Sequence, residues 1–206
     1  MIRLYRAPYS TNVERVALAL AHKGLEAESV VIDYSDRSTV IQVSGQGLVP
    51  VIVDEGEVVV DSTEIMRHLE RRYPDPPLFP SDPARLAEMD VFLAWFNEVW
   101  KAAPNNIEAL LEEGGDPDGE EIASEAERMR EHLDLFERLL SGGDSLLGVG
   151  PSAADFAAFP FLKYARGRDP ADDELFHRIL ELNQPLGDAH PRLTAWIERV
   201  DERPRA

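Results

Sequence analysis

The sequence predicts an α/β domain followed by an all-helical domain, and three observations support this prediction. Residues 1–73 alternate between short apolar runs typical of strands and amphipathic runs typical of helices. Residues 73–83 contain five prolines, which neither a helix interior nor a central strand accommodates. From residue 84 onward, the apolar residues recur at helical spacing. We therefore expect a first domain at residues 1–76 and a second at 84–206, joined by a linker.

The first domain is expected to have the element order β-α-β-α-β-β-α. A helix between the first two strands implies that they are parallel, whereas the last two strands form an antiparallel hairpin around Asp54-Glu55-Gly56-Glu57. Capping boxes at Thr11–Glu14 and Asp61–Glu64 mark two helix starts. The strands are predicted at residues 2–5, 29–32, 51–53 and 58–60, and the helices at 11–23, 36–43 and 61–73.

The second domain is expected to be helical throughout. A long helix rich in aromatic residues is predicted over residues 85–113, with a kink at Pro104. A capping box at Ser152–Asp155 starts a short, apolar helix. The remaining helices are expected at 118–141 and near 171–182 and 190–202.

Composition excludes several classes of function. The chain has 39 acidic and 21 basic residues, a net charge of −18, which disfavours nucleic acid and anionic membranes as partners. It has no cysteine, so disulfides, thiolate metal sites and a cysteine nucleophile are excluded. No run of apolar residues is long enough to span a membrane, and residues 1–6 do not resemble a signal peptide. We expect a cytoplasmic protein.

Metal and nucleotide motifs are missing from the sequence. None of the five histidines has another histidine three or four residues away, so no metal site is expected. Neither a Gly-x-Gly-x-x-Gly motif nor a Gly-x-Ser-x-Gly motif occurs.

Three short segments are candidates for chemistry. Ser10 and Thr11 stand at a predicted helix N-terminus, where backbone N–H groups favour an anion such as a thiolate. A cis bond between Val49 and Pro50 would turn the backbone of Val49 toward an extended peptide ligand. Asp61-Ser62, before another helix, could hold an amine and a carboxylate. Taken alone, the first and third segments are more typical of plain helix capping.

Together and in this order, these segments resemble the glutathione transferase family. The resemblance covers the whole chain, and Ser10 matches the catalytic turn of the serine-type classes. The other matching motifs are Gly47-Leu48-Val49-Pro50, Asp61-Ser62, the capping box Ser152–Asp155 with Phe156, and Pro191-Arg192-Leu193 with Trp196.

The resemblance implies a thioredoxin-like first domain that binds glutathione as co-substrate. Ser10 would donate a hydrogen bond to the glutathione sulfur, with Thr11 as the alternative donor. Val49 would pair its backbone with the cysteinyl unit, next to a cis Pro50. Asp61 and Ser62 would hold the amine and carboxylate of the γ-glutamyl unit.

The resemblance also implies a second site, for a small hydrophobic electrophile, lined by Tyr9, Trp95 and Trp100. At helical spacing, aromatic residues such as these are more typical of a core. Leu48 departs from the family, because many relatives have Lys or Arg there. The leading hypothesis is conjugation of glutathione to electrophiles; the alternatives are a non-catalytic glutathione-transferase-like binding protein and a glutathione-dependent isomerase or peroxidase.

The family resemblance further implies a homodimer. Arg67, Arg71 and Arg72 of the helix at 61–73 would face the acidic second domain of a partner subunit. Residues 81–206 hold 13 basic and 27 acidic groups. The interface is therefore expected between that helix and the aromatic helix near residues 85–100.

Overall fold

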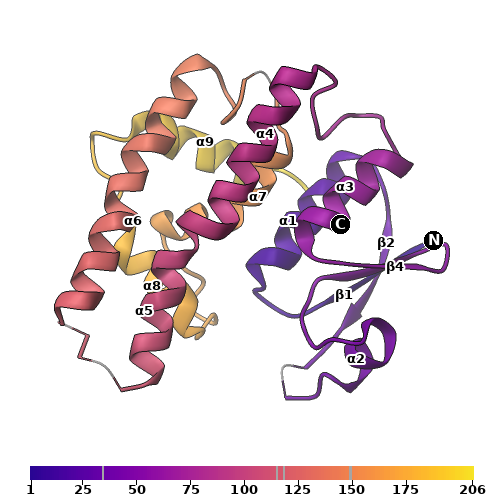
Figure 1. Ribbon diagram of the computed structural model, residues 1–206, viewed down its shortest axis with the longest axis horizontal. Helices are drawn as coiled ribbons and strands as arrows, with labels where there is room; N and C mark the ends of the chain where they lie inside the picture. The colour runs from indigo at the N-terminus through magenta and orange to yellow at the C-terminus, as the bar shows by residue number, and fades with distance from the viewer. Residues whose placement is uncertain (34, 115, 118, 149) are drawn as a thin grey trace. The chain divides into compact units, whose positions relative to one another are not determined.

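A computed structural model describes residues 1–33, 35–114, 116–117, 119–148 and 150–206 (Figure 1). The chain divides into two compact units, one of Met1–Pro83 with Arg203–Ala206 and the other of Ala84–Glu202. The sequence placed residues 203–206 in the second domain, whereas in the structure they pack with the first unit.

The first unit has the predicted order of strands and helices. A four-stranded sheet has the order β2-β1-β3-β4. The parallel pair β1–β2 and the antiparallel hairpin β3–β4 are as predicted, and the structure adds an antiparallel pairing of β1 with β3. Figure 1 shows α1 and α3 on one side of this sheet and α2 on the other. The elements are β1 (Ile2–Arg6), α1 (Thr11–His22), β2 (Ala27–Val31), α2 (Ser38–Ser44), β3 (Val51–Asp54), β4 (Glu57–Val60) and α3 (Ser62–Arg72).

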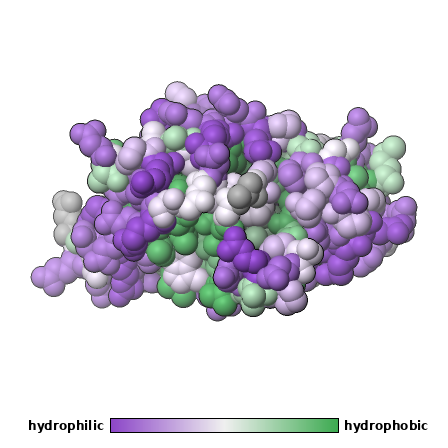
Figure 2. Space-filling model, turned by 90° about the horizontal axis from the view of Figure 1, so that it is seen from above, coloured by the Kyte–Doolittle hydropathy of each residue, from purple (hydrophilic) through white to green (hydrophobic). Residues whose placement is uncertain are grey.

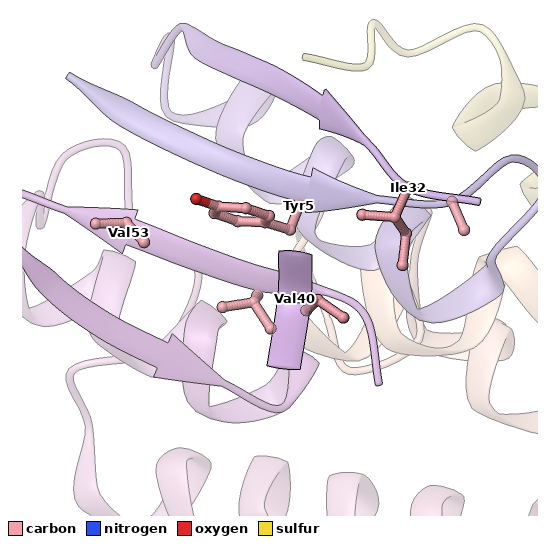
Figure 3. Packing of buried hydrophobic residues seen from close by; sticks show 6 residues of the cluster. Tyr5, Ile32, Val40 and Val53 are labelled. Carbon is pink, nitrogen blue, oxygen red and sulfur yellow. The ribbon is translucent and has the colours of Figure 1, made fainter. Parts of the chain in front are cut away.

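Alternation along the strands builds a core on each side of the sheet. On the α2 side, Tyr5, Ile32, Val40 and Val53 form one buried cluster (Figure 3). Val49 packs against the edge of this cluster. The loop that leads from α2 into β3 is therefore anchored to the core by the residue just before Pro50.

A buried lysine attaches the proline-rich segment to the first unit. The Lys23 Nζ donates to Glu70 Oε2 at 2.8 Å and to the carbonyl oxygens of Tyr73 and Pro76 at 2.6 and 3.0 Å. The Lys23 side chain has no exposed surface, and Glu70 also accepts the Leu78 N–H at 2.9 Å. The first residues after α3 thus belong to the folded unit.

The second unit is all helical, as predicted. It contains α4 (Pro83–Trp95), a π-helical turn (Phe96–Trp100), α5 (Ala102–Glu112), α6 (Glu120–Leu139), α7 (Ala153–Leu162), α8 (Leu175–Asn183) and α9 (Pro191–Asp201), with short 3₁₀ turns at Leu140–Gly142 and Lys163–Arg166. The predicted first residue of the helix at 118–141 lies outside the described residues.

The prediction of one helix over 85–113 with a kink at Pro104 is wrong. The interruption falls earlier, at the π-helical turn Phe96–Trp100. Pro104 then lies in the first turn of α5, where its missing N–H would have no partner within the helix.

The capping box at Ser152–Asp155 is confirmed and extends into the core. The fully buried Asp155 accepts from the Ser152 N–H at 2.9 Å, from the Leu146 N–H at 3.0 Å and from the Trp196 Nε1 at 2.8 Å. Burial raises the pKa of the Asp155 carboxyl above its ordinary value, while these hydrogen bonds oppose the rise. One side chain therefore joins α7, the loop before it and α9.

Hydrophilic side chains cover most of the face seen in Figure 2, consistent with the 29 % of charged residues. Among the residues that the structure describes, no helix is both long and apolar enough to cross a membrane.

Candidate functional site

The N-terminus of α1 presents Ser10 to solvent. Ser10, rather than Thr11, is the N-cap, because its φ and ψ of −60° and 113° are extended and its Oγ accepts the Val13 N–H at 3.4 Å. The predicted cap at Thr11 is therefore wrong by one residue, and with Val13 at the third helical position the reciprocal half of a capping box is not possible. A hydroxyl that accepts through a lone pair keeps its own proton for donation. Ser10 is partly exposed, whereas Thr11 is only 6 % exposed in the first turn.

The residue before Ser10 has an unusual backbone. Tyr9 has a φ of +58°, which non-glycine residues rarely adopt, and its side chain is 42 % exposed. This conformation reverses the chain between β1 and α1, so that Ser10 caps the helix while Tyr9 points away from the core.

The loop before β3 has the predicted backbone at Pro50. The Val49–Pro50 peptide is cis, and Pro50 is buried while the Leu48 side chain is 69 % exposed. The Gln46 side-chain amide hydrogen-bonds both backbone groups of Leu48. Its Oε1 accepts the Leu48 N–H, and its Nε2 donates to the Leu48 carbonyl oxygen at 2.9 Å. Among the residues that the structure describes, the backbone of Val49 makes no hydrogen bond.

A cation that the sequence did not single out lies beside the same loop. Arg37, just before α2, donates from Nη1 to the Gly47 carbonyl oxygen at 2.9 Å. Arg37 as a whole is partly exposed. The apolar Leu48 therefore follows a residue whose carbonyl oxygen binds an arginine.

The start of α3 holds Asp61 and Ser62. Asp61 is the exposed N-cap, and its Oδ1 accepts the Thr63 and Glu64 N–H groups at 2.8 and 3.1 Å. Its φ of +67° is a strained position for a residue with a side chain, and such strain costs about 1–3 kcal/mol. Ser62 is only 3 % exposed.

Arg15 joins the two helix starts, and the sequence analysis missed it. Its side chain is buried at 1 % exposure, and its Nη1 donates to Ser62 Oγ at 3.2 Å. Burial lowers the pKa of Arg15 to about 9, while the nearby Asp61 carboxylate raises it. An arginine within an apolar helical stripe gives no sign of burial in a sequence, because its partners lie some 47 residues away.

The aromatic residues predicted to line an electrophile pocket belong to different units. Tyr9 is in the first, and Trp95 and Trp100 are in the second. Trp95 is partly buried against His132 and Phe136, with ring centroids 5.3 and 5.9 Å away. Trp100 is 1 % exposed and stacks on Phe96 at 4.6 Å. Packing within its own unit accounts for Trp100; that it lines a pocket stays a prediction.

Two buried histidines have carboxylate partners. His68 Nε2 lies 2.9 Å from Asp54 Oδ2, and His177 Nδ1 lies 2.8 Å from Asp172 Oδ2. In the part of the chain that the structure describes, no group of three or more His, Cys, Asp or Glu side chains is arranged to hold a metal ion.

Two family models match the chain. The model described as "Glutathione S-transferase, N-terminal domain" matches residues 4–77, and "Glutathione S-transferase, C-terminal domain" matches residues 94–199. The first covers the proposed site residues Tyr9, Ser10, Thr11, Val49, Pro50, Asp61 and Ser62.

Characterised relatives match almost the whole chain. A maleylacetoacetate isomerase of Pseudomonas aeruginosa is 30 % identical over 92 % of each chain. Glutathione S-transferase 3 of Zea mays is 29 % identical over 98 % of this chain and 90 % of its own. A solved glutathione S-transferase of Methylobacterium radiotolerans, in complex with glutathione sulfonate, is 27 % identical over 98 % of this chain and 91 % of its own, with a TM-score of 0.73.

Proposed function

Since this chain belongs to the glutathione S-transferase family, we propose that it conjugates the thiolate of glutathione to small hydrophobic electrophiles. The observation that carries the proposal is that two helix N-termini, at Ser10 and at Asp61-Ser62, are joined by one buried arginine in the same unit. Helix N-termini favour anions, and glutathione offers a thiolate and a γ-glutamyl carboxylate.

In this proposal, each residue has one role. The Ser10 hydroxyl donates to the sulfur, and the backbone of Val49 pairs with the cysteinyl unit beside cis Pro50. Ser62 and the start of α3 receive the γ-glutamyl carboxylate, and Asp61 receives the amine. Thr11 is buried in the first turn of α1, so Ser10 is the more accessible of the two hydroxyls. In this proposal Thr11 supports the helix and does not contact the sulfur.

These groups can supply the free energy that is needed to form the thiolate. A free thiol has a pKa of about 8.5, so little thiolate is present at neutral pH. Lowering that pKa by about two units requires about 2.7 kcal/mol. A charge-assisted hydrogen bond contributes about 1.5–3 kcal/mol and a helix N-terminus about 0.3–1 kcal/mol. No general base is then required.

We also propose that the glycyl carboxylate of glutathione lies beside the loop at Gly47-Leu48, where Arg37 supplies a cation and Leu48 cannot. We expect Arg37→Ala to raise the KM for glutathione several-fold with little change in kcat, because it removes binding that the ground state and the transition state share. Steady-state kinetics at varied glutathione concentration measure this, and an unchanged KM would remove Arg37 from the site.

The proposed function is tested by two measurements on the same protein. Calorimetry with glutathione should show binding, and an aryl halide assay should show glutathione-dependent conjugation. Binding without turnover of any electrophile would favour a non-catalytic binding protein. No binding of glutathione would overturn the proposal.

Isomerisation is a second candidate function, favoured by the similarity to the Pseudomonas aeruginosa maleylacetoacetate isomerase. Both reactions use a glutathione thiolate, so the same Ser10 would serve either one. A substrate panel containing an aryl halide, a cis-configured 1,4-dicarbonyl alkene and a hydroperoxide distinguishes conjugase, isomerase and peroxidase activities.

We also propose a homodimer, in which α3 of one subunit packs against α4 of the other. On α4, the exposed side chains of Ala84, Ala87, Val91 and Ala94 recur at helical spacing. On α3, Arg71 is exposed, whereas Arg67 lies 3.6 Å from Glu64 and Arg72 is paired with Glu55. These local pairs reduce the charge that α3 offers to a partner, so we expect apolar contact at α4 to contribute most.

A further inference from the structure

Residues Arg203–Ala206 lie along α1, within the first unit. Arg205 donates to Glu14 Oε1 from Nη2 at 2.9 Å and from Nε at 3.2 Å. The Ala206 N–H donates to the Ala17 carbonyl oxygen at 3.1 Å, and Arg6 Nη1 donates to the Ala206 carbonyl oxygen at 3.0 Å. This segment is therefore fixed to both α1 and β1, the two elements that flank Ser10.

Glu14 places a negative charge at the N-terminus of α1. It stands in the first turn of α1, and its N–H donates to the Ser10 carbonyl oxygen at 3.0 Å. A carboxylate at a helix N-terminus stabilises the helix, but it opposes a second negative charge at the same end. The side chains of Glu14 and Arg205 are only 15 % and 26 % exposed, so water screens the pair incompletely.

We propose that Arg205 is a positioning residue of the thiolate site: by pairing with Glu14, it neutralises a carboxylate that would otherwise oppose a thiolate at the N-terminus of α1. The inference rests on the proposed function, because it assumes that glutathione binds with its sulfur at Ser10. Other ionisable groups lie at the same end of the unit, namely Tyr9 and Arg15 on the α1 side and Asp61 and Glu64 at the start of α3.

The test is a pH titration of the ultraviolet absorbance of enzyme-bound glutathione thiolate, a readout that requires no turnover. Arg205→Gln removes the positive charge beside Glu14 and should raise the pKa of the bound thiol by roughly 0.3–1 unit, the size expected for one charge near a protein surface. Glu14→Gln removes the negative charge beside Arg205 and should lower that pKa. The double variant should return close to the original value.

Arg203→Gln is the matched control. It removes the same charge from the same segment without touching the Glu14 pair, and it should leave the thiol pKa unchanged. A purely structural role of the pair predicts that both single variants move the pKa in the same direction or not at all, and either result overturns the inference. Thermal melts of each variant verify that the compared proteins are folded.

The outcome also separates this inference from the proposed function. If the original chain binds no glutathione, both fall together. If it binds glutathione, and Ser10→Ala loses the thiolate signal while Arg205→Gln behaves like the original chain, only the inference falls.

Discussion

Ser10 is the residue on which the proposed chemistry depends most. Its Oγ already accepts the Val13 N–H, so the geometry of its hydroxyl is set by the helix that it caps. Capping and donation to a ligand use different parts of the same hydroxyl group, which reconciles the two explanations that the sequence left open.

Replacement of Ser10 by alanine should therefore lower kcat/KM for a generic electrophile by about 10- to 1,000-fold, equal to about 1.4–4 kcal/mol of transition-state stabilisation. Glutathione affinity should change less, because the other contacts to the tripeptide remain. Thr11→Ala is the matched control and should retain most of the activity. The assignment would move to Thr11 if the two variants showed the reverse pattern.

Residues with local roles were predictable, and those with distant partners were not. Pro50 and Asp61 carry short-range signals, because a cap or a proline at a strand start can be recognised from its neighbours. At α1 the same kind of signal placed the cap at Thr11, one residue after the actual cap Ser10. Lys23 and Arg15 give no such signal, since their partners lie 47 or more positions away. The burial of both is a consequence of tertiary structure.

Among the elements, the apolar helix α7 depends on one carboxylate. Asp155 accepts from the loop before the helix, from the cap residue and from α9. The sequence predicted the cap, because a capping box needs only four residues. It did not predict the contact with Trp196, which lies 41 positions further along the chain.

Asp155→Ala should reduce the free energy of unfolding by about 3–5 kcal/mol, because it leaves several buried donors without an acceptor. Urea denaturation followed by tryptophan fluorescence measures the loss. Asp144→Ala, at an exposed position of the loop before α7, is the control and should cost little. A loss below about 1 kcal/mol for Asp155→Ala would show that the network contributes little to stability.

The packing of α4 against α6 includes a histidine whose protonation opposes folding. His132 of α6 meets the Trp95 ring edge-on at 5.3 Å, and burial lowers its pKa below the ordinary value while Glu131 opposes the shift. Because the pKa of His132 is lower in the folded than in the unfolded protein, the unfolded state binds the proton more readily. The free energy of unfolding is therefore highest above the pKa of the unfolded state and decreases as the pH falls through it.

The melting temperature should therefore fall between about pH 7.5 and pH 5.5, on either side of the ordinary histidine pKa of about 6.5. In His132→Phe the fall should be smaller, because that side chain has no proton to gain. His22 has a pKa lowered by burial as well, so part of the fall should persist in the variant. Equal falls in the two proteins would exclude His132 as a contributor.

At the scale of the whole molecule, charge and apolar surface act in opposite directions on association. The net charge of −18 makes two copies repel one another, whereas the exposed side chains of α4 favour contact. The repulsion is screened beyond about 8 Å at physiological ionic strength.

We therefore expect a homodimer whose association strengthens as salt is raised from low to moderate concentration. Analytical ultracentrifugation of the 23.1 kDa chain in both buffers is the measurement. Val91→Glu, which introduces a charge on α4, should shift the population toward monomer, while Leu182→Glu on α8 should not. A monomer in both buffers at micromolar concentration would contradict the proposal.

The contact between Glu14 and Arg205 also bears on how the chain is made. The two residues are 191 positions apart, so the first unit is discontinuous in the sequence and encloses the whole of Ala84–Glu202 between its parts. During synthesis, α1 leaves the ribosome long before its last partner exists, and contacts of such high sequence separation form late because their loop closure is entropically costly. The sheet and its helices can assemble early, but the electrostatic surroundings of Ser10 are completed only after the helical unit has been translated.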